Sequence, residues 1–190
     1  MQEPMEQQLQ EWAEYIGNFK LPRWNTLPEI ELYMDQIIML IEKHLSGLLW
    51  CKKNLLTPAM VNNYVKLGLI PKPIKKKYNR KHLSHLIVIT LLKELFAIGE
   101  IKVAIEIQTD REGTGEAAYN LFCTEIEQAL AAASAEMLGK SQPVTLPVEP
   151  RSRLLRMAAR AFACRSAANQ EVILHYQYQQ NNQQQGEYLK

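Results

Sequence analysis

The sequence predicts a mainly α-helical protein, and three observations carry this prediction. Apolar residues recur three and four positions apart over most of the chain, which is the spacing of one face of a helix. No alternation of apolar and polar residues is long enough to build a sheet. The chain has 190 residues, of which 47% are apolar, so it has the size of one domain with small extensions and can bury a core.

The N-terminal part is predicted to contain two helices joined by an arm. Apolar residues at helical spacing predict a short amphipathic helix over 5–19. The second helix is predicted over 28–46, because Pro28 suits the first position of a helix and Gly47 follows the last apolar residue of the stripe.

A short helix is predicted over 57–67. Thr57 is a favourable N-cap residue, and Pro58 suits the first helical position because its missing N–H would have no partner there. Gly68 then ends the helix.

The segment 70–78 contains two prolines and is predicted to form a wing or loop rather than a helix. Asn79 caps the next helix, 79–97, which is apolar nearly all round and therefore suits the centre of a core. Further helices are predicted over 100–108, 115–138 and from 151 to the mid-170s, with a proline-rich linker over 140–150 and a Gln-rich tail.

Charge is distributed very unevenly. The 51 residues from Lys43 to Lys93 include 11 Lys and Arg but no Asp or Glu, whereas the rest of the chain has 11 bases and all 20 acids. A basic stretch of +11 within a remainder of −9 indicates a partner with dense negative charge: nucleic acid first, an anionic membrane surface second. A solvated basic face is the alternative, although such faces usually mix both signs.

Motifs of catalysis are absent from the sequence: there is no Gly-rich phosphate loop, HExxH, Gly-x-Ser-x-Gly or Cys-x-x-Cys. His82 and His85 are three apart but have no Cys, Asp or Glu nearby to complete a metal site. Three widely spaced cysteines argue against a disulfide framework, and the longest apolar run is too short to cross a bilayer. We therefore expect a cytoplasmic protein that is no enzyme, carries no cofactor or metal, and has no membrane partner.

The capped helix and the basic wing together suit double-stranded DNA. A short helix with small polar residues near its start can enter a major groove, where asparagines read base edges, while lysines of a wing neutralise phosphates. The candidate DNA-binding residues are Thr57, Asn62, Asn63, Tyr64, Lys66, Lys72, Lys75, Lys76, Lys77, Tyr78 and Arg80.

The segment 57–103 resembles the winged helix-turn-helix of MerR-type regulators. The shared positions are Tyr64, Gly68, Leu69, Tyr78, Leu83, Leu86, Ile89, Ile98, Glu100 and Ile101. Asn62 stands where that family usually has an arginine, and Lys75 and Lys76 stand where it has tyrosine and arginine. Lys76 keeps the charge of the arginine but lacks its bidentate fork.

A wider part of the chain, from LPRWNTLPEIELYMDQ through the wing to about 108, is also similar to a bacterial domain-of-unknown-function family, number 1836. Both resemblances imply a mainly α fold: a MerR-like winged helix-turn-helix with flanking helices and a C-terminal helical region. The implied regions are an N-terminal helix and arm (1–26), a winged helix-turn-helix DNA-binding domain (27–108), a C-terminal helical region for dimerisation or sensing (109–175) and a Gln-rich disordered tail (176–190).

We therefore expect a DNA-binding transcriptional regulator with a recognition helix at 57–67 and a basic wing at 70–78. A homodimer is expected through residues after 112, because the alanine-rich stripe of the helix 115–138 should not be left bare. The arginine-rich helix from 151 is interpreted as packing against that acidic helix, with a second nucleic-acid surface as the alternative. For the whole chain, the alternative is a protein–protein interaction module that retains the fold without sequence-specific DNA binding.

Overall fold

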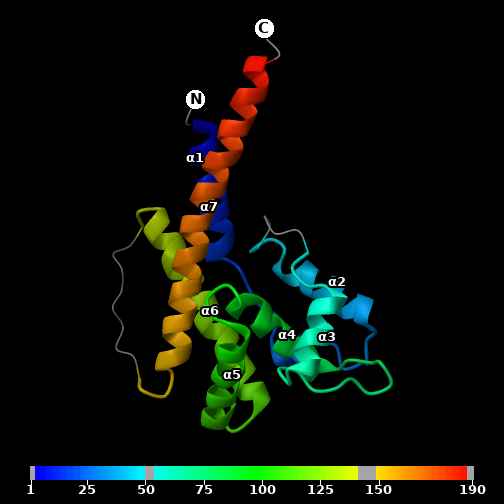
Figure 1. Cartoon of the computed structure of the whole chain (residues 1–190). Coiled ribbons are helices and arrows are strands. Elements are labelled where there is room, and N and C mark those ends of the chain that lie inside the picture. The colour runs from blue at the N-terminus through cyan, green and yellow to red at the C-terminus, as the bar shows by residue number, and fades with distance from the viewer. Residues whose placement is uncertain (1–2, 50–53, 141–148, 188–190) are drawn as a thin grey trace.

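The computed structural model describes residues 3–49, 54–140 and 149–187, and it is mainly helical (Figure 1). These residues form no β-strand longer than an isolated bridge. The elements in chain order are α1 (Glu3–Gly17), the short 3-10 helix η1 (Trp24–Thr26), α2 (Met34–Leu45), α3 (Pro58–Lys66), α4 (Arg80–Leu92), α5 (Ile98–Glu112), α6 (Gly115–Met137) and α7 (Arg153–Glu187).

Helix α4 lies at the centre of the molecule, between α2 on one side and α6 and α7 on the other (Figure 1). Leu86, Ile87 and Ile89 of α4 are completely buried, which fits a helix that is apolar nearly all round. Helix α6 packs against α1, α5 and α7, so the core is continuous from the N-terminal helix to the last one.

Helices α1 and α6 approach each other closely where α1 ends. A Cβ atom built on Gly17 would lie 2.6 Å from the hydroxyl oxygen of Ser134. A glycine at this position therefore lets the two helices pack without displacing the serine.

The interpretation of the arginine-rich helix as a partner of the acidic helix 115–138 is confirmed within a single chain. Arg156 of α7 donates from Nε and from a terminal nitrogen to the two carboxylate oxygens of Glu125 on α6, each at 3.0 Å. Arg165 of α7 also pairs with Glu94, which follows α4, at 2.6 Å. These arginines are held by the protein's own carboxylates.

The alanine-rich stripe of α6 is covered inside the chain, which removes the reason for predicting a dimer through it. Ala118, Ala129, Leu130 and Ala133 are all buried, and α1, α5 and α7 pack over this helix. Small side chains here allow close packing between helices of the same chain.

Several predicted helix boundaries differ from the structure. Helix α2 begins at Met34 rather than near 28, because Leu32 pairs with Tyr78 in a backbone bridge and the residues just before it are in bends rather than helix. Helix α4 ends at Leu92 rather than 97, and Glu100 starts α5 by accepting from the backbone N–H of Ala97 at 2.8 Å.

The prediction of a disordered tail from 176 is wrong for the residues as far as Glu187, which continue helix α7. Glutamine is a good helix former, so a Gln-rich segment that continues an existing helix does not have to leave it. Most of the linker predicted over 140–150 lies outside the described residues.

Candidate nucleic-acid interface

Helix α3 is fixed at both ends by the residues that predicted it. The Thr57 hydroxyl accepts from the backbone N–H of Met60 at 3.3 Å, and Pro58 occupies the first helical position. Gly68 has a φ of +70°, and the N–H of Leu69 donates to the carbonyl of Tyr64 at 2.9 Å. This is the glycine-dependent way to end a helix, since other residues rarely adopt a left-handed backbone.

Two faces of α3 have different roles. Val61 and Tyr64 point into the core, while Asn62, Asn63 and Lys66 are exposed. An exposed asparagine amide presents a donor and an acceptor side by side, which matches the edge of an adenine in the major groove. The exposed face of α3 therefore carries the polar groups that base reading requires.

The wing is a tight turn between two residues that pair with each other. Ile74 and Lys77 form an antiparallel bridge, and the N–H of Lys77 donates to the carbonyl of Ile74 at 2.9 Å. The two residues between them, Lys75 and Lys76, have φ values of +50° and +62°. Two consecutive positive φ angles in a two-residue loop are the pattern of a type I′ turn, which normally takes Asn-Gly. The turn thus places two lysines where the backbone disfavours them.

The base of the wing is anchored by Tyr78. Its backbone N–H and carbonyl pair with the carbonyl and N–H of Leu32, both at 2.8 Å. The Tyr78 ring packs edge-on against His82, with 5.3 Å between the ring centroids. Tyr64 and Tyr78 are each only 3% exposed, so the prediction that their side chains contact DNA is corrected: both rings belong to the core.

Arg80, another predicted DNA contact, is used within the protein to hold the arm that precedes α2. Its guanidinium donates twice to the carbonyl of Leu27, at 3.1 and 2.9 Å, and once to the carboxylate of Glu29 at 3.0 Å. The sequence pattern could not distinguish this arginine from the lysines beside it.

The wing lysines differ in how far the protein neutralises them. Lys77 lies 3.6 Å from the carboxylate of Glu31 and 6.0 Å from the ring centre of Tyr33. By contrast, no carboxylate of the described residues lies within ion-pair distance of Lys66, Lys72, Lys75 or Lys76, and all four are exposed. These four lysines remain available to an anionic partner.

His82 connects the wing to α4. Its Nδ1 accepts from the backbone N–H of Asn79 at 3.0 Å, and the Asn79 side chain in turn accepts from the N–H groups of Lys81 and His82. Burial lowers the pKa of His82, while the backbone at Pro71 and Lys72 acts in the opposite direction. The ring is therefore neutral at pH 7, and its role is to cap the helix and support the wing.

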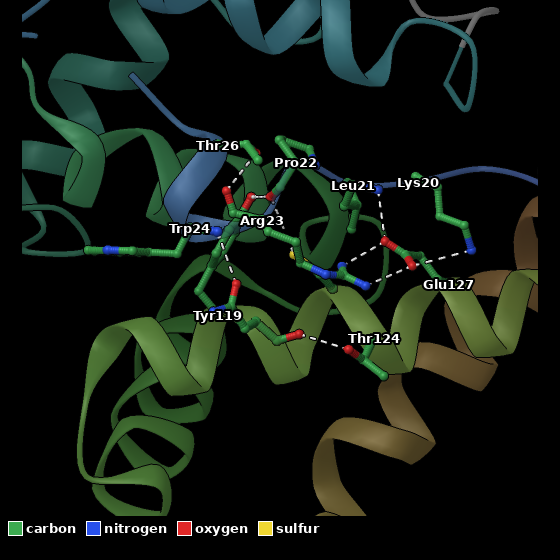
Figure 2. A network of polar contacts seen from close by, with 11 residues as sticks. Lys20, Leu21, Pro22, Arg23, Trp24, Thr26, Tyr119, Thr124 and Glu127 are labelled. Carbon is green, nitrogen blue, oxygen red and sulfur yellow. Dashed lines mark hydrogen bonds and ion pairs between the residues drawn. The ribbon is translucent and has the colours of Figure 1, made fainter. Parts of the chain in front are cut away.

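A second polar network, which sequence reasoning missed, fastens the N-terminal arm to α6 (Figure 2). The carboxylate of Glu127 accepts from the backbone N–H of Leu21 at 2.9 Å and from both terminal nitrogens of Arg23, at 2.7 and 2.9 Å. The Tyr119 hydroxyl donates to the carbonyl of Pro22 at 2.8 Å, and burial raises the pKa of Tyr119 above its ordinary range. This network is structural, because each of these donors and acceptors is hydrogen-bonded to another group of the protein.

Other kinds of site were also sought. Among the described residues, His, Cys, Asp and Glu side chains form no group of three that could hold a metal ion. None of the described helices is both long enough and apolar enough to cross a membrane.

Taken together, the fold and this surface define a mainly helical protein that exposes a short capped helix and a lysine-bearing turn on one acid-free stretch of chain. The chain belongs to the family described as Domain of unknown function (DUF1836), whose model matches residues 22–122, more than half of its length. The matched region contains α2 to α5 and the whole candidate interface. No curated protein and no solved structure matches the chain.

Proposed function

We propose that this protein is a cytoplasmic transcriptional regulator that binds double-stranded DNA through a MerR-like winged helix-turn-helix. In this proposal α3 is the recognition helix, with Asn62 and Asn63 reading bases, and the wing over 70–78 contacts the phosphate backbone. The proposal assigns no catalytic step and needs no cofactor.

One observation carries the proposal: among the described residues, no carboxylate lies within ion-pair distance of Lys66, Lys72, Lys75 or Lys76, although several arginines elsewhere in the chain are ion-paired. Arg23, Arg80, Arg156 and Arg165 all donate to carboxylates of the chain. Lys75 and Lys76 instead stand at the tip of a turn, with backbone angles that lysine rarely adopts. Unpaired cations presented at a tip are suited to a densely charged anion such as the DNA backbone.

The test measures how DNA affinity depends on salt. Fluorescence anisotropy would follow binding to a labelled 24-base-pair duplex of random sequence, roughly the span of two helical turns, between 50 and 200 mM NaCl, the range over which phosphate contacts dominate salt dependence. Removing both charges in Lys75→Ala/Lys76→Ala should reduce the slope of log K against log salt by about two. The matched control, Lys140→Ala/Arg153→Ala, removes two exposed charges far from the interface and should leave the slope unchanged.

A protein–protein interaction module is the second candidate, and a specific observation favours it. Leu67 at the end of α3 and Ile74 in the wing are large apolar side chains, 47% and 67% exposed, that lie among the lysines in sequence. Apolar side chains with interspersed cations also suit an acidic protein surface. Absence of duplex binding by the wild-type protein at 50 mM salt, a concentration at which phosphate contacts are only weakly screened, would favour this candidate over the first.

We also propose that the protein binds DNA as a homodimer, because helix-turn-helix proteins usually read paired half-sites. With the α6 stripe covered, one candidate surface after residue 112 is the distal part of α7, which extends beyond the body of the molecule beside α1 (Figure 1). Val172 and Tyr176 are 67% and 61% exposed there. Light scattering at micromolar concentration should give twice the chain mass of 21.9 kDa, and Val172→Glu/Tyr176→Glu should return it to one.

A further inference from the structure

A small apolar cavity lies on the side of α4 that faces α5, α6 and α7. It has a volume of about 60 Å³ and is partly open to solvent. Its apolar lining includes Val88 and Phe96, together with Ile105 of α5, Phe122 of α6 and Leu155 of α7. Four helices of the fold therefore contribute to one cavity.

The residues lining this cavity include five with polar side chains: Ser84, His85, Gln108, Thr109 and Tyr119. Gln108 and His85 offer acceptors, and Oε1 of Gln108 has no partner among the described residues. Gln108 is only 8% exposed, and its Oε1 has no hydrogen-bond partner within the described residues. Its Nε2 donates to the carboxylate of Glu112 at 3.3 Å. Since a carboxylate can only accept, this bond fixes the orientation of the amide and leaves the carbonyl oxygen as the unpaired group.

The second acceptor is the ring of His85. Its Nδ1 lies 2.8 Å from the carbonyl oxygen of Lys81, so this nitrogen carries the proton and donates. Burial lowers the pKa of His85, which keeps the ring neutral at pH 7. In that state Nε2 can only accept, so His85 and Gln108 both present acceptors that a ligand donor could satisfy. The hydroxyls of Ser84 and Tyr119, which also line the cavity, already donate to the carbonyls of Lys81 and Pro22.

We propose that this cavity binds a small, neutral, apolar or aromatic molecule that carries a hydroxyl or N–H group, with the donor directed at Oε1 of Gln108. An unpaired buried acceptor is costly, and a ligand that supplies the donor removes the cost while covering the apolar lining. An anion would meet these two acceptors and the nearby Glu112, which disfavours anionic ligands. At about 60 Å³ the cavity is less than half the size of the roughly 150 Å³ cavity known to hold a whole benzene ring, so it encloses part of a ring or a short branched chain and the rest of the ligand lies at the open side.

The test uses phenol and toluene as probes, because they have nearly the same shape and only phenol has a donor. Protein labelled at Ile, Leu and Ala methyl groups would be titrated with each probe and followed by NMR, with Ile105 and Leu155 as local reporters. Phenol should bind with a millimolar or lower dissociation constant. The ratio of phenol to toluene affinity should fall about five- to tenfold in Gln108→Leu, the loss expected for one hydrogen bond.

Ala104→Leu is the second variant, because this half-exposed residue of α5 lines the cavity and leucine is also a good helix former. It should fill the space and weaken both probes at least fivefold while the protein stays folded, so the test does not depend on the stability of Gln108→Leu. Lack of phenol binding up to 10 mM, a limit that corresponds to about 2.7 kcal/mol of binding, would overturn the proposal. Binding that Ala104→Leu leaves unchanged, or an unaltered affinity ratio in Gln108→Leu, would overturn it as well.

Discussion

Replacing the two turn lysines by the residues that the turn prefers, Lys75→Asn/Lys76→Gly, should make the protein more stable and weaken its binding to DNA. Both lysines have a positive φ, at 50° and 62°. Asparagine tolerates this conformation and glycine adopts it freely, so Asn-Gly is the favoured pair for such a turn. The same change removes two unpaired cations from the tip of the wing.

The stability gain follows from two opposing terms. A left-handed backbone costs an ordinary residue about 1–2 kcal/mol, and glycine avoids this cost. Glycine instead loses more conformational entropy on folding, which costs about 0.5–1 kcal/mol. The net gain for the pair is therefore about 1 kcal/mol. For a chain of this length that corresponds to a rise of about 2–4 °C in melting temperature. The salt slope for DNA binding should fall by about two, as for any variant that loses two phosphate contacts.

Differential scanning calorimetry and the anisotropy titration measure the two effects separately. Lys75→Arg/Lys76→Arg is the matched control, because it retains both charges and the same backbone preference and should change neither quantity. A lower melting temperature in Lys75→Asn/Lys76→Gly would refute the interpretation of the turn. A higher melting temperature with an unchanged salt slope would show that the turn is as described but that its lysines do not contact DNA.

Three further predictions concern other parts of the structure. Glu127→Ala should destabilise the protein by about 2–4 kcal/mol, because it leaves the N–H of Leu21 and the guanidinium of Arg23 without their partner. Lys20→Ala, at an exposed end of the same network, should cost less than about 0.5 kcal/mol. Urea unfolding measures the free energy of unfolding of both variants. The pKa values of His44, His82 and His85 are lowered by burial, so the folded state binds fewer protons than the unfolded state. The free energy of unfolding should therefore be at its full value above about pH 6.5 and fall as the pH drops below that value. In His85→Gln this loss on acidification should be smaller. A free energy of unfolding that rises on acidification would contradict the prediction. Asn63→Ala should relax base preference in a selection from random duplexes while leaving the salt slope within error of the wild type, since asparagine carries no charge.

Local signals in the sequence were sufficient for α3 and for the start of α4. Thr57, Pro58 and Gly68 act on backbone groups no more than a few residues away, so their effect can be read without knowing the fold. Asn79 caps α4 for the same reason. The exposed and buried faces of α3 also follow from its spacing, because Val61 and Tyr64 lie on one side of the helix.

Partners that are distant in sequence could not be predicted. Arg23 and Glu127 are 104 residues apart, and Arg80 reaches a carbonyl 53 residues before it. No spacing rule connects such residues, so Arg80 was grouped with the free lysines on the basis of its charge alone. The tail was misjudged for a different reason: composition indicates how weakly a segment can bury itself, but not whether a neighbouring helix will extend into it.

The turn lysines are the place where residue preference and backbone conformation conflict. Of the described residues other than glycine, three have a positive φ: Asn54, Lys75 and Lys76. Asparagine adopts that region readily, so the two lysines are the residues in need of an explanation. A sequence selected for folding alone would place Asn-Gly at this turn, because that pair costs less and keeps the same register. Two cations retained there against the preference of the backbone, with no carboxylate of the described residues beside them, are best explained by an anionic partner that meets the tip of the wing.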